Sequence, residues 1–431
     1  MKDYLKTGLS RRSFMRTLGA ASVAATALPV FAADQQQQNA ACTTTAAGQG
    51  QGRGRRPGGG DAGDMGERVV DPLAVVISSN ENPLGPSIPA REAIAKVGAL
   101  GGRYNQQYKS ETVKTFSDIM GLKPGYVNFF PGSGGPLSLS IYANVSPNLP
   151  LIVGDPSYES GASAGARMCA KVFRIPLTAS GAHDVKAMLA ASPIAGAYYI
   201  TNPNNPTGTM TPKADIVWLV KNKPAGSVVV IDEAYHHFSN DDSSIDLVAQ
   251  DQDVIVLRTF SKIYGMAGLR GGFYIAKPEL QAKLGTIGVG VSRNGAGVVS
   301  IATAVACTAS LQDKTLIPTR RRINADIRDN VLEWMDKNGY AYMKGSQANF
   351  FQADVKRPGK EFAVLMAKEH IHIGRTWNAM PNYSRITVGT QEEMDKFKIA
   401  FKKCYEIAPG TAAAHLEFED HFNELHFSQS V

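Results

Sequence analysis

The stretch SVVVID, residues 227–232, decides how this chain folds. Three valines, an isoleucine and a closing aspartate are typical of a strand that is buried on both faces. Similar apolar runs occur elsewhere in the chain: LIVGD, GAYYIT and DVIVLRT, at residues 151–155, 196–201 and 253–259. Helical stretches such as TPKADIVWLVKNK, residues 211–223, separate such runs. This alternation predicts an α/β fold, in which helices cover both faces of a mostly parallel sheet.

Polar residues close these strands or directly follow them. They are Asp155, Asn202, Asp232 and Thr259. Because the carboxyl ends of parallel strands meet at one edge of a sheet, and ligands gather beyond that edge, we expect the functional site there. We place this large domain, with an N-terminal arm, at residues 69–317.

The pattern changes after about Pro318. A charged helical stretch, TRRRINADIRDNVLEWMDKNG, is followed by ANFFQADV, FAVLMAKEHIHIG, SRITVGT and QEEMDKFKIAFKKCYEIA. The order helix, strand, helix, strand, helix predicts a smaller α+β C-terminal domain at residues 318–408. For residues 409–431 the sequence indicates no role.

The chain begins with a segment typical of protein export. Arg11 and Arg12 precede an apolar run over residues 18–31, which is too short and too rich in alanine for a membrane span. Small residues follow the run, as a cleavage site requires. Residues 1–32 therefore resemble a twin-arginine (Tat) signal peptide, which implies export machinery as a partner, a periplasmic location and no stable membrane insertion. The alternative is an N-terminal helix with a chance arginine pair.

Residues 33–68 contain mainly Gln, Thr, Gly, Ala and Arg, with little to bury, and are predicted to be a disordered tether. The chain up to Arg68 carries nine lysines and arginines against five acids, and thus more than half of the net charge of +7. The positive charge is therefore no sign of nucleic-acid binding. The cysteines are too widely spaced for a metal site, and whether any disulfide forms stays open: Cys42, Cys169, Cys307 and Cys404.

One lysine lies among small residues in TFSKIYGMAGLRGG, residues 259–272. A lysine amine can bond covalently to a carbonyl cofactor, and the small neighbours of Lys262 let a flat ring approach closely. The planar guanidinium of Arg270 suits a phosphate, and Thr259 and Ser261 add hydroxyl donors. The alternative is a surface lysine on a glycine-rich turn.

This segment resembles the lysine segment of the class I/II pyridoxal-phosphate aminotransferases, which are fold type I enzymes. Its companion motifs stand in the family's order: NPNNPTG, DEAYHHF and SRITVGT, at residues 202–208, 232–238 and 384–390. NENPLGPS, residues 80–87, and the pair Arg103-Tyr104 narrow the resemblance to the histidinol-phosphate aminotransferase branch. The resemblance spans about residues 73–408 and implies pyridoxal 5′-phosphate as the cofactor.

The resemblance also implies roles for single residues. Lys262 would hold the cofactor and later move a proton as general acid and base. Asp232 would keep the pyridine nitrogen protonated. Asn205 and Tyr235 would donate to the phenolic oxygen of the ring, and Tyr158 would stack on the ring.

The cofactor phosphate needs its own donors. PGSGGPLSLS, residues 131–140, opens a helix, and the amides of Ser133 and Gly134 at its positive end suit a dianion. Here Gly135 departs from the family, which has an acidic residue or threonine at this position. Tyr104 resembles a tyrosine that reaches the phosphate of a neighbouring subunit, which implies a homodimer.

Two arginines are implied for substrate binding. Arg385 would grip an acidic group of the substrate with both guanidinium nitrogens, and Arg375 would help to hold a phosphate or carboxylate. Asn82, in the NENPLGPS motif, is the third expected substrate contact. His236 and His237 lack spaced partners for a metal site, so no metal is expected.

The expected reaction is ping-pong transamination of an amino acid or a phosphorylated amino alcohol with a 2-oxo acid. Histidinol phosphate is the specific expectation, and an aromatic or basic amino acid is the other. The same residues would serve a racemase, a lyase, a decarboxylase or an oxidase, and an exported biosynthetic enzyme would be unusual. A non-catalytic binder of amines or cofactor is a further alternative, but binding alone needs neither Lys262 nor Asp232.

Overall fold

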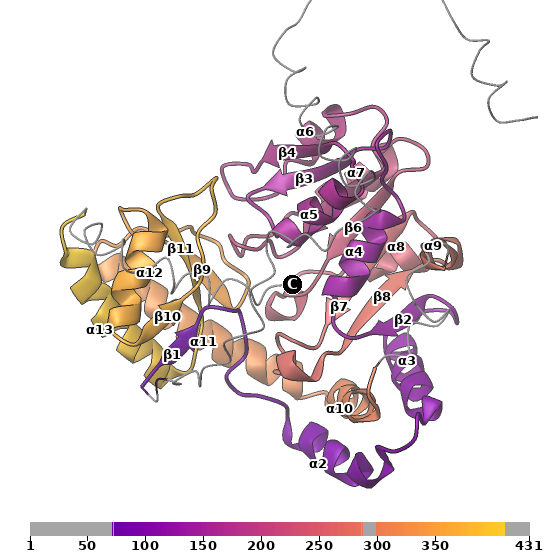
Figure 1. Ribbon diagram of the computed structural model, residues 1–431, viewed down its shortest axis with the longest axis horizontal. Helices are drawn as coiled ribbons and strands as arrows, with labels where there is room; N and C mark the ends of the chain where they lie inside the picture. The colour runs from indigo at the N-terminus through magenta and orange to yellow at the C-terminus, as the bar shows by residue number, and fades with distance from the viewer. Residues whose placement is uncertain (1–70, 72, 286, 288–298, 410–431) are drawn as a thin grey trace, which may run out of the picture. The chain divides into compact units, whose positions relative to one another are not determined.

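The computed structural model describes residues 71, 73–285, 287 and 299–409 (Figure 1). The expectations for the export signal and the tether lie outside these residues, as does the expected tail apart from Pro409. No helix in the described part of the chain is both long enough and apolar enough to cross a membrane.

The large domain is built on a seven-stranded sheet with the strand order β2-β8-β7-β6-β5-β3-β4. Neighbours from β7 to β4 run parallel, whereas β8 runs antiparallel to both β7 and β2. The bounds are β2 Val127–Phe130, β3 Leu151–Asp155, β4 Val172–Pro176, β5 Ala197–Thr201, β6 Val228–Asp232, β7 Val254–Thr259 and β8 Gly272–Ala276. The predicted α/β fold with a mostly parallel sheet is confirmed.

Alternate side chains of the central strands pack on opposite faces of the sheet. In β6, Val229 and Ile231 belong to one hydrophobic cluster, while Val228 and Val230 belong to another. Because successive side chains of a strand point to opposite sides, a strand with helices on both faces needs apolar residues at every position. This requirement explains the uninterrupted VVVI run.

Helices cover both faces, as Figure 1 shows. One face packs against helices that share a cluster with Val229: α2 Ile88–Val97, α3 Gln106–Met120, α6 Val185–Ala190, α7 Lys213–Asn222, α8 Ile245–Ala249 and α10 Ile301–Gln312. The other face packs against three helices: α4 Gly134–Tyr142, α5 Glu159–Arg167 and α9 Pro278–Leu284. Short 3-10 turns complete the domain at η2 Gly98–Leu100, η3 His236–Phe238 and η4 Ala267–Leu269.

The C-terminal part has its own hydrophobic cluster. It contains α11 Leu316–Lys337, β9 Phe350–Asp354, α12 Gly359–Lys368, β10 Ile371–Ile373, β11 Tyr383–Thr387 and α13 Gln391–Glu406. A capping box at Thr390 and Glu393 begins α13. Strands β9 and β11 pair antiparallel. The helix expected through FAVLMAKEHIHIG was wrong at its end, because His370 turns the chain with a φ of 61° and the next residues form β10.

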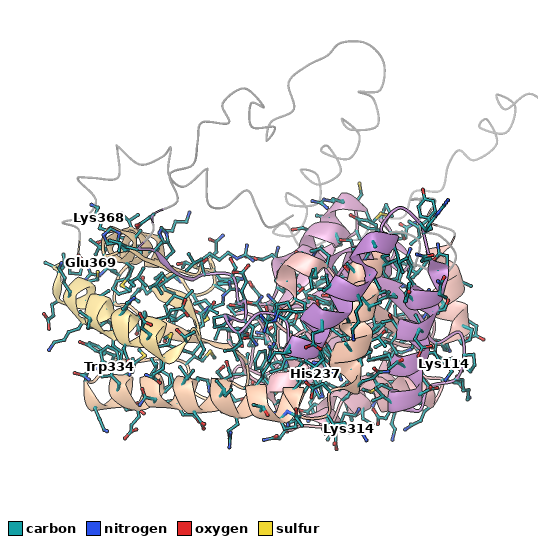
Figure 2. All side chains as sticks on the ribbon, turned by 90° about the horizontal axis from the view of Figure 1, so that it is seen from below. Lys114, His237, Lys314, Trp334, Lys368 and Glu369 are labelled. Carbon is teal, nitrogen blue, oxygen red and sulfur yellow. The ribbon has the colours of Figure 1, made fainter. Side chains whose placement is uncertain are left out.

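The small domain also takes a strand from the beginning of the described chain. Strand β1, Val75–Ile77, pairs parallel with β10, and both Val75 and Ile77 lie in the small-domain cluster. Figure 1 shows this indigo strand among the orange and yellow elements. Residues 78–85 then lead back to the large domain; we call this segment the arm. Figure 2 shows α11 running as one long helix from beside Lys314 past Trp334, so that it serves both domains.

Candidate active site

The site begins where neighbouring parallel strands end. Thr201 at the end of β5 pairs with Asp232 at the end of β6, and β7 ends beside them at Thr259. The loops that follow these ends carry Asn205, Tyr235 and Lys262. The sheet thus gathers three motifs that are far apart in the sequence at one edge.

Lys262 lies in the turn after β7 and is half-buried. Its Nζ donates to the carbonyl oxygen of Ser79 at 3.2 Å and lies 5.4 Å from the ring centre of Tyr235. Burial, with a smaller contribution from Arg385, lowers the pKa of the Lys262 amine to about 8. A lowered pKa keeps more of the amine unprotonated near neutral pH, as a nucleophile or general base requires.

Asp232 is a buried carboxylate without an ion-pair partner among the residues that the structure describes. Its Oδ1 accepts from the amide of Ala234 and its Oδ2 from the hydroxyl of Tyr199, both at 3.1 Å. Burial raises the pKa of Asp232 to about 6. Such a carboxylate is suited to a cationic ligand.

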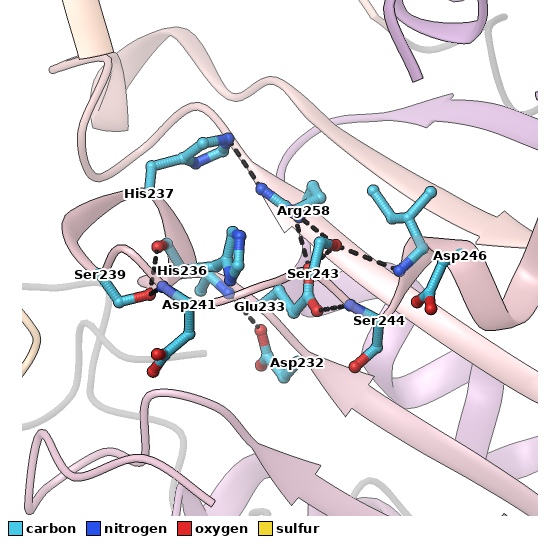
Figure 3. A network of polar contacts seen from close by, with 12 residues as sticks. Asp232, Glu233, His236, His237, Ser239, Asp241, Ser243, Ser244, Asp246 and Arg258 are labelled. Atoms are coloured by element: carbon cyan, nitrogen blue, oxygen red, sulfur yellow. Dashed lines mark hydrogen bonds and ion pairs between the residues drawn. The ribbon is translucent and has the colours of Figure 1, made fainter. Parts of the chain in front are cut away.

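A buried polar network beside Asp232 holds the strand ends together (Figure 3). Glu233 forms an ion pair of 2.7 Å with Arg258 of β7, and its Oε1 accepts from the amide of Ser244 at 2.6 Å. Arg258 also contacts Nε2 of His237 at 2.8 Å and donates to the hydroxyl of Ser243 at 2.8 Å. Because one partner follows Asp232 and the other precedes Thr259, the ion pair fixes the ends of β6 and β7 relative to each other.

Tyr235 and Asn205 lie together, as expected. The hydroxyl of Tyr235 accepts from Nδ2 of Asn80 at 2.9 Å and from Nδ2 of Asn205 at 3.5 Å. Oδ1 of Asn205 in turn accepts from Nη1 of Arg385 at 2.8 Å. Nη2 of Arg385 donates to the carbonyl oxygen of Ser78 at 2.7 Å. One chain of hydrogen bonds therefore joins the arm, the loops after β5 and β6, and Arg385 of the small domain.

The two expected substrate arginines both lie near one aromatic ring. The guanidinium carbons of Arg375 and Arg385 lie 4.8 Å and 5.3 Å from the ring centre of Trp377. Arg375 forms an ion pair with Glu159, the first residue of α5. Arg385 is buried, and its Nε has no hydrogen-bond partner in the described part of the protein. Burial lowers the pKa of Arg385 to about 10, which leaves its guanidinium charged at neutral pH.

The expected phosphate donors lie around Arg270. Its Nη1 donates to the hydroxyl of Ser261 at 3.2 Å, and Thr259 donates to the same hydroxyl at 2.9 Å. Gly132 has a φ of 81°, and a Cβ there would overlap Nη2 of Arg270, so only glycine allows this approach. Ser133 follows at the N-terminus of α4, whose positive end favours an anion.

Three further expected residues differ in how close they lie to this site. Nδ2 of Asn82 donates to the carbonyl oxygen of Ile263 at 3.1 Å, so Asn82 contacts the lysine turn. Tyr158 precedes α5 and is partly buried. Tyr104 is 84% exposed and makes no contact with the site of its own chain.

Sequence reasoning missed four side chains of this site. Asn80 stands in the same motif as Asn82, and Trp377 stands two positions after Arg375, so both had a signal in a neighbouring candidate. Glu159 directly follows Tyr158. Tyr199 lies inside an apolar strand, and nothing in the sequence distinguishes it from a packed aromatic residue.

A family model described as aminotransferase class I and II matches residues 74–399. The chain belongs to this family. The expectation of a pyridoxal-phosphate-dependent aminotransferase is thereby confirmed.

Curated relatives and solved structures agree. The chain is 30% identical to the histidinol-phosphate aminotransferase of Brevibacillus brevis, covering 76% of this chain and 90% of the relative. It is 32% identical to histidinol-phosphate aminotransferase 1 of Cupriavidus pinatubonensis, covering 76% and 88%. The fold is similar to that of the Sinorhizobium meliloti histidinol-phosphate aminotransferase in complex with pyridoxal-5′-phosphate. That structure has a TM-score of 0.70 and 23% identity, with 77% of this chain and 90% of the other covered.

The residues present fit pyridoxal 5′-phosphate, the cofactor of this enzyme. Asp232 is a buried carboxylate that forms no ion pair with any described residue, which suits a pyridinium nitrogen. Arg270, Ser261 and the N-terminus of α4 suit the phosphate, and a Cβ built at Gly134 would meet no atom within 4 Å, so there is space beside these donors. Lys262 directly follows Ser261 in the turn after β7, and its amine can bond to the cofactor aldehyde.

Proposed function

We propose that the enzyme transaminates a phosphorylated amino alcohol of the histidinol-phosphate kind, with a 2-oxo acid as the amino acceptor. The observation that carries this proposal is the pair of arginines whose guanidinium groups both lie near the ring of Trp377. Two guanidinium groups suit a dianionic phosphate better than a single one does, because each can donate to two oxygens. The names of the curated relatives support the same substrate class.

Each residue of the site has its own role in the proposed transamination. Bound pyridoxal phosphate supplies an electron sink for negative charge at the substrate's α-carbon. The Asp232 carboxylate would keep the ring nitrogen protonated, and Nζ of Lys262 would take a proton from the α-carbon and deliver it to C4′ of the cofactor. Asn205 and Tyr235 donate to the ring oxygen. Arg385 orients the substrate by its anionic group, which keeps the α-carbon within reach of Lys262.

A second candidate substrate is an α-amino acid. It is favoured by the ion pair between Glu159 and Arg375, which engages one of the two arginines. Arg385 alone then suits a singly charged α-carboxylate, and the ring of Trp377 suits a planar side chain. An aromatic or basic amino acid meets both conditions.

The test is single-turnover bleaching of the yellow holoenzyme by a panel of amines. The panel contains histidinol phosphate, histidinol, histidine, phenylalanine, lysine and an uncharged alkylamine, each with and without 2-oxoglutarate. We expect histidinol phosphate to react fastest and histidinol, which lacks only the phosphate, to react at least tenfold more slowly. Equal rates for histidinol and its phosphate would contradict the phosphate proposal. Faster reaction of histidine or phenylalanine would favour the second candidate.

We also propose that the enzyme is exported in its folded form through the twin-arginine route. The support is sequence alone: Arg11-Arg12, the apolar run after them and the small residues at its end. Changing both arginines to lysine keeps the charge but removes the paired guanidinium groups. Cell fractionation should then find the enzyme in the cytoplasm with its cofactor bound. Unchanged export of the double variant would refute this proposal.

A homodimer with shared sites is the third proposal. Its support is an exposed apolar stretch in and after the arm, where Leu84, Ile88, Leu100 and Tyr104 all expose more than 40% of their surface. Apolar side chains gathered along one stretch are typical of a subunit interface. Tyr104 would then complete the phosphate site of the partner subunit.

A further inference from the structure

Arg320 is a buried cation: burial lowers the pKa of its guanidinium, and the nearby carboxylate of Asp313 offsets this only in part. It lies near the start of α11, the helix that Figure 2 shows along both domains, and it exposes 8% of its surface. Among the described residues it forms no ion pair. Its Nη1 donates to the carbonyl oxygen of Ile263 at 3.0 Å, and its Nη2 donates to that of Gly85 at 2.6 Å. A buried guanidinium held only by two main-chain carbonyls is costly, so its position calls for a reason.

The two carbonyls belong to the lysine turn and to the arm. Ile263 directly follows Lys262, and the turn closes where the amide of Gly265 donates to the carbonyl oxygen of Lys262 at 2.9 Å. A Cβ at Gly265 would overlap the carbonyl of Gly85 and lie 2.9 Å from Nη1 of Arg320. The turn and the arm therefore meet backbone to backbone, and Arg320 bonds to both sides of this contact.

A small cavity lies between the arm and α11, and Arg320 lines it together with Leu84, Ile323 and Asn324. The same arm supplies the carbonyl oxygen of Ser79, which accepts from Nζ of Lys262 at 3.2 Å. The arm thus touches the lysine residue at its amine and at its turn.

We propose that Arg320 is a positioning residue for Lys262. By bonding to Ile263 and Gly85 it fixes the lysine turn against the arm, and so fixes where the Lys262 amine stands when it transfers the proton. The catalytic group remains Lys262, and Arg320 acts through it. This role concerns proton transfer and is the same whichever substrate the enzyme takes.

The test compares the Arg320→Gln and Arg320→Lys holoenzymes with Arg322→Gln, which changes an exposed arginine two positions further along the same helix. For each we measure kcat, KM, the α-deuterium isotope effect with the fastest amine of the panel above, and the pH titration of the cofactor's visible absorbance. A displaced amine should lower kcat of the glutamine variant by about 10- to 100-fold with little change in KM. The isotope effect should rise and the absorbance titration should shift.

The lysine variant should recover part of kcat and of the titration, because an ammonium group can still donate to these carbonyls. The Arg322→Gln enzyme should match the wild type. A glutamine variant that loses activity only in proportion to its loss of bound cofactor, with the isotope effect and the titration unchanged, would overturn the proposal. If the glutamine variant does not fold, Arg320→Met takes its place, because methionine fills similar space but donates no hydrogen bond; a wild-type isotope effect and titration at full cofactor content would then equally overturn the proposal.

Discussion

At the scale of single residues, Asp232 couples function to stability. Its folded pKa of about 6 lies above the ordinary aspartate pKa of 3.8, so the folded apoprotein binds a proton more tightly than the unfolded chain does. The stability contributed by this difference is complete below pH 4 and is lost as the pH rises through 6. A shift of this size corresponds to roughly 3 kcal/mol that the buried carboxylate costs the apoprotein at neutral pH.

Asp232→Asn should therefore stabilise the apoprotein and impair the enzyme. We expect urea unfolding of the apo variant to show a gain of about 1–3 kcal/mol at pH 8 and no gain near pH 4. In the holoenzyme, loss of the charge at the ring nitrogen should raise the activation free energy by about 2–4 kcal/mol. Asp326→Asn, at an exposed position of α11, is the control. Turnover near that of the wild type would show that ring protonation is not needed.

Glu159 gives a second prediction at this scale. If Arg375 binds substrate as proposed, the Glu159 carboxylate would compete with an anionic substrate for it; the side chains of Glu159 and Arg375 are 37% and 31% exposed. A pair this exposed contributes about 0.2–1 kcal/mol, so Glu159→Gln should lower KM for anionic amines by up to about fivefold and leave kcat unchanged.

The matched control for Glu159 is Glu392→Gln, which breaks an exposed ion pair with Lys396 on α13. Steady-state kinetics at two salt concentrations provide the measurement. The competition idea fails if KM for anionic amines rises in Glu159→Gln, or if KM for uncharged amines falls by the same factor.

At the scale of elements, the loop between β2 and α4 sets the phosphate site. Gly132→Ala should push Arg270 away, because the new methyl group would occupy the place of the guanidinium. We expect the cofactor to dissociate at least tenfold faster, as judged by dialysis and the absorbance that remains. Gly125→Ala is the matched control, since its φ of 87° is similar and nothing lies within 4 Å of the new Cβ. Equal cofactor retention in both variants would mean that backbone strain alone acts.

The sequence predicts these elements unevenly. β6 and β7 were recognisable because a strand between two helical layers must be apolar throughout. The arginines, Asp232 and Lys262 stand in motifs, and the strand ends bring them together. By contrast, β1 and β10 have three residues each, and Val76 is exposed, so no periodicity could reveal their pairing. Glu159 and Asn80 meet their partners, Arg375 and Tyr235, only when distant segments of the chain come together. A local sequence pattern cannot reveal such contacts.

At the scale of the whole molecule, the proposed homodimer predicts complementation. Lys262→Ala removes the amine from a subunit's own site, and Tyr104→Ala would remove the side chain that reaches the phosphate site of the partner subunit. In a mixed dimer one site carries both lesions and the other carries neither. After mixing equal amounts and allowing subunits to exchange, about a quarter of wild-type activity should return, because half of the dimers are mixed and each has one intact site.

Each variant incubated alone is the control for this experiment. Sedimentation should show a dimer before and after mixing. A fully active monomer, or a Tyr104→Ala enzyme with normal activity, would exclude the shared site.

The pairing of β1 with β10 has a consequence for how the chain is made. Val75 leaves the ribosome long before Ile371, its partner in the sheet. During synthesis the first strand must wait, without a partner, until nearly all of the protein has emerged, and closing so long a loop is slow. The small domain can therefore assemble only when translation is almost complete. For an enzyme exported in the folded state, as proposed above, export would therefore have to wait until β10 has been synthesised and has paired with β1.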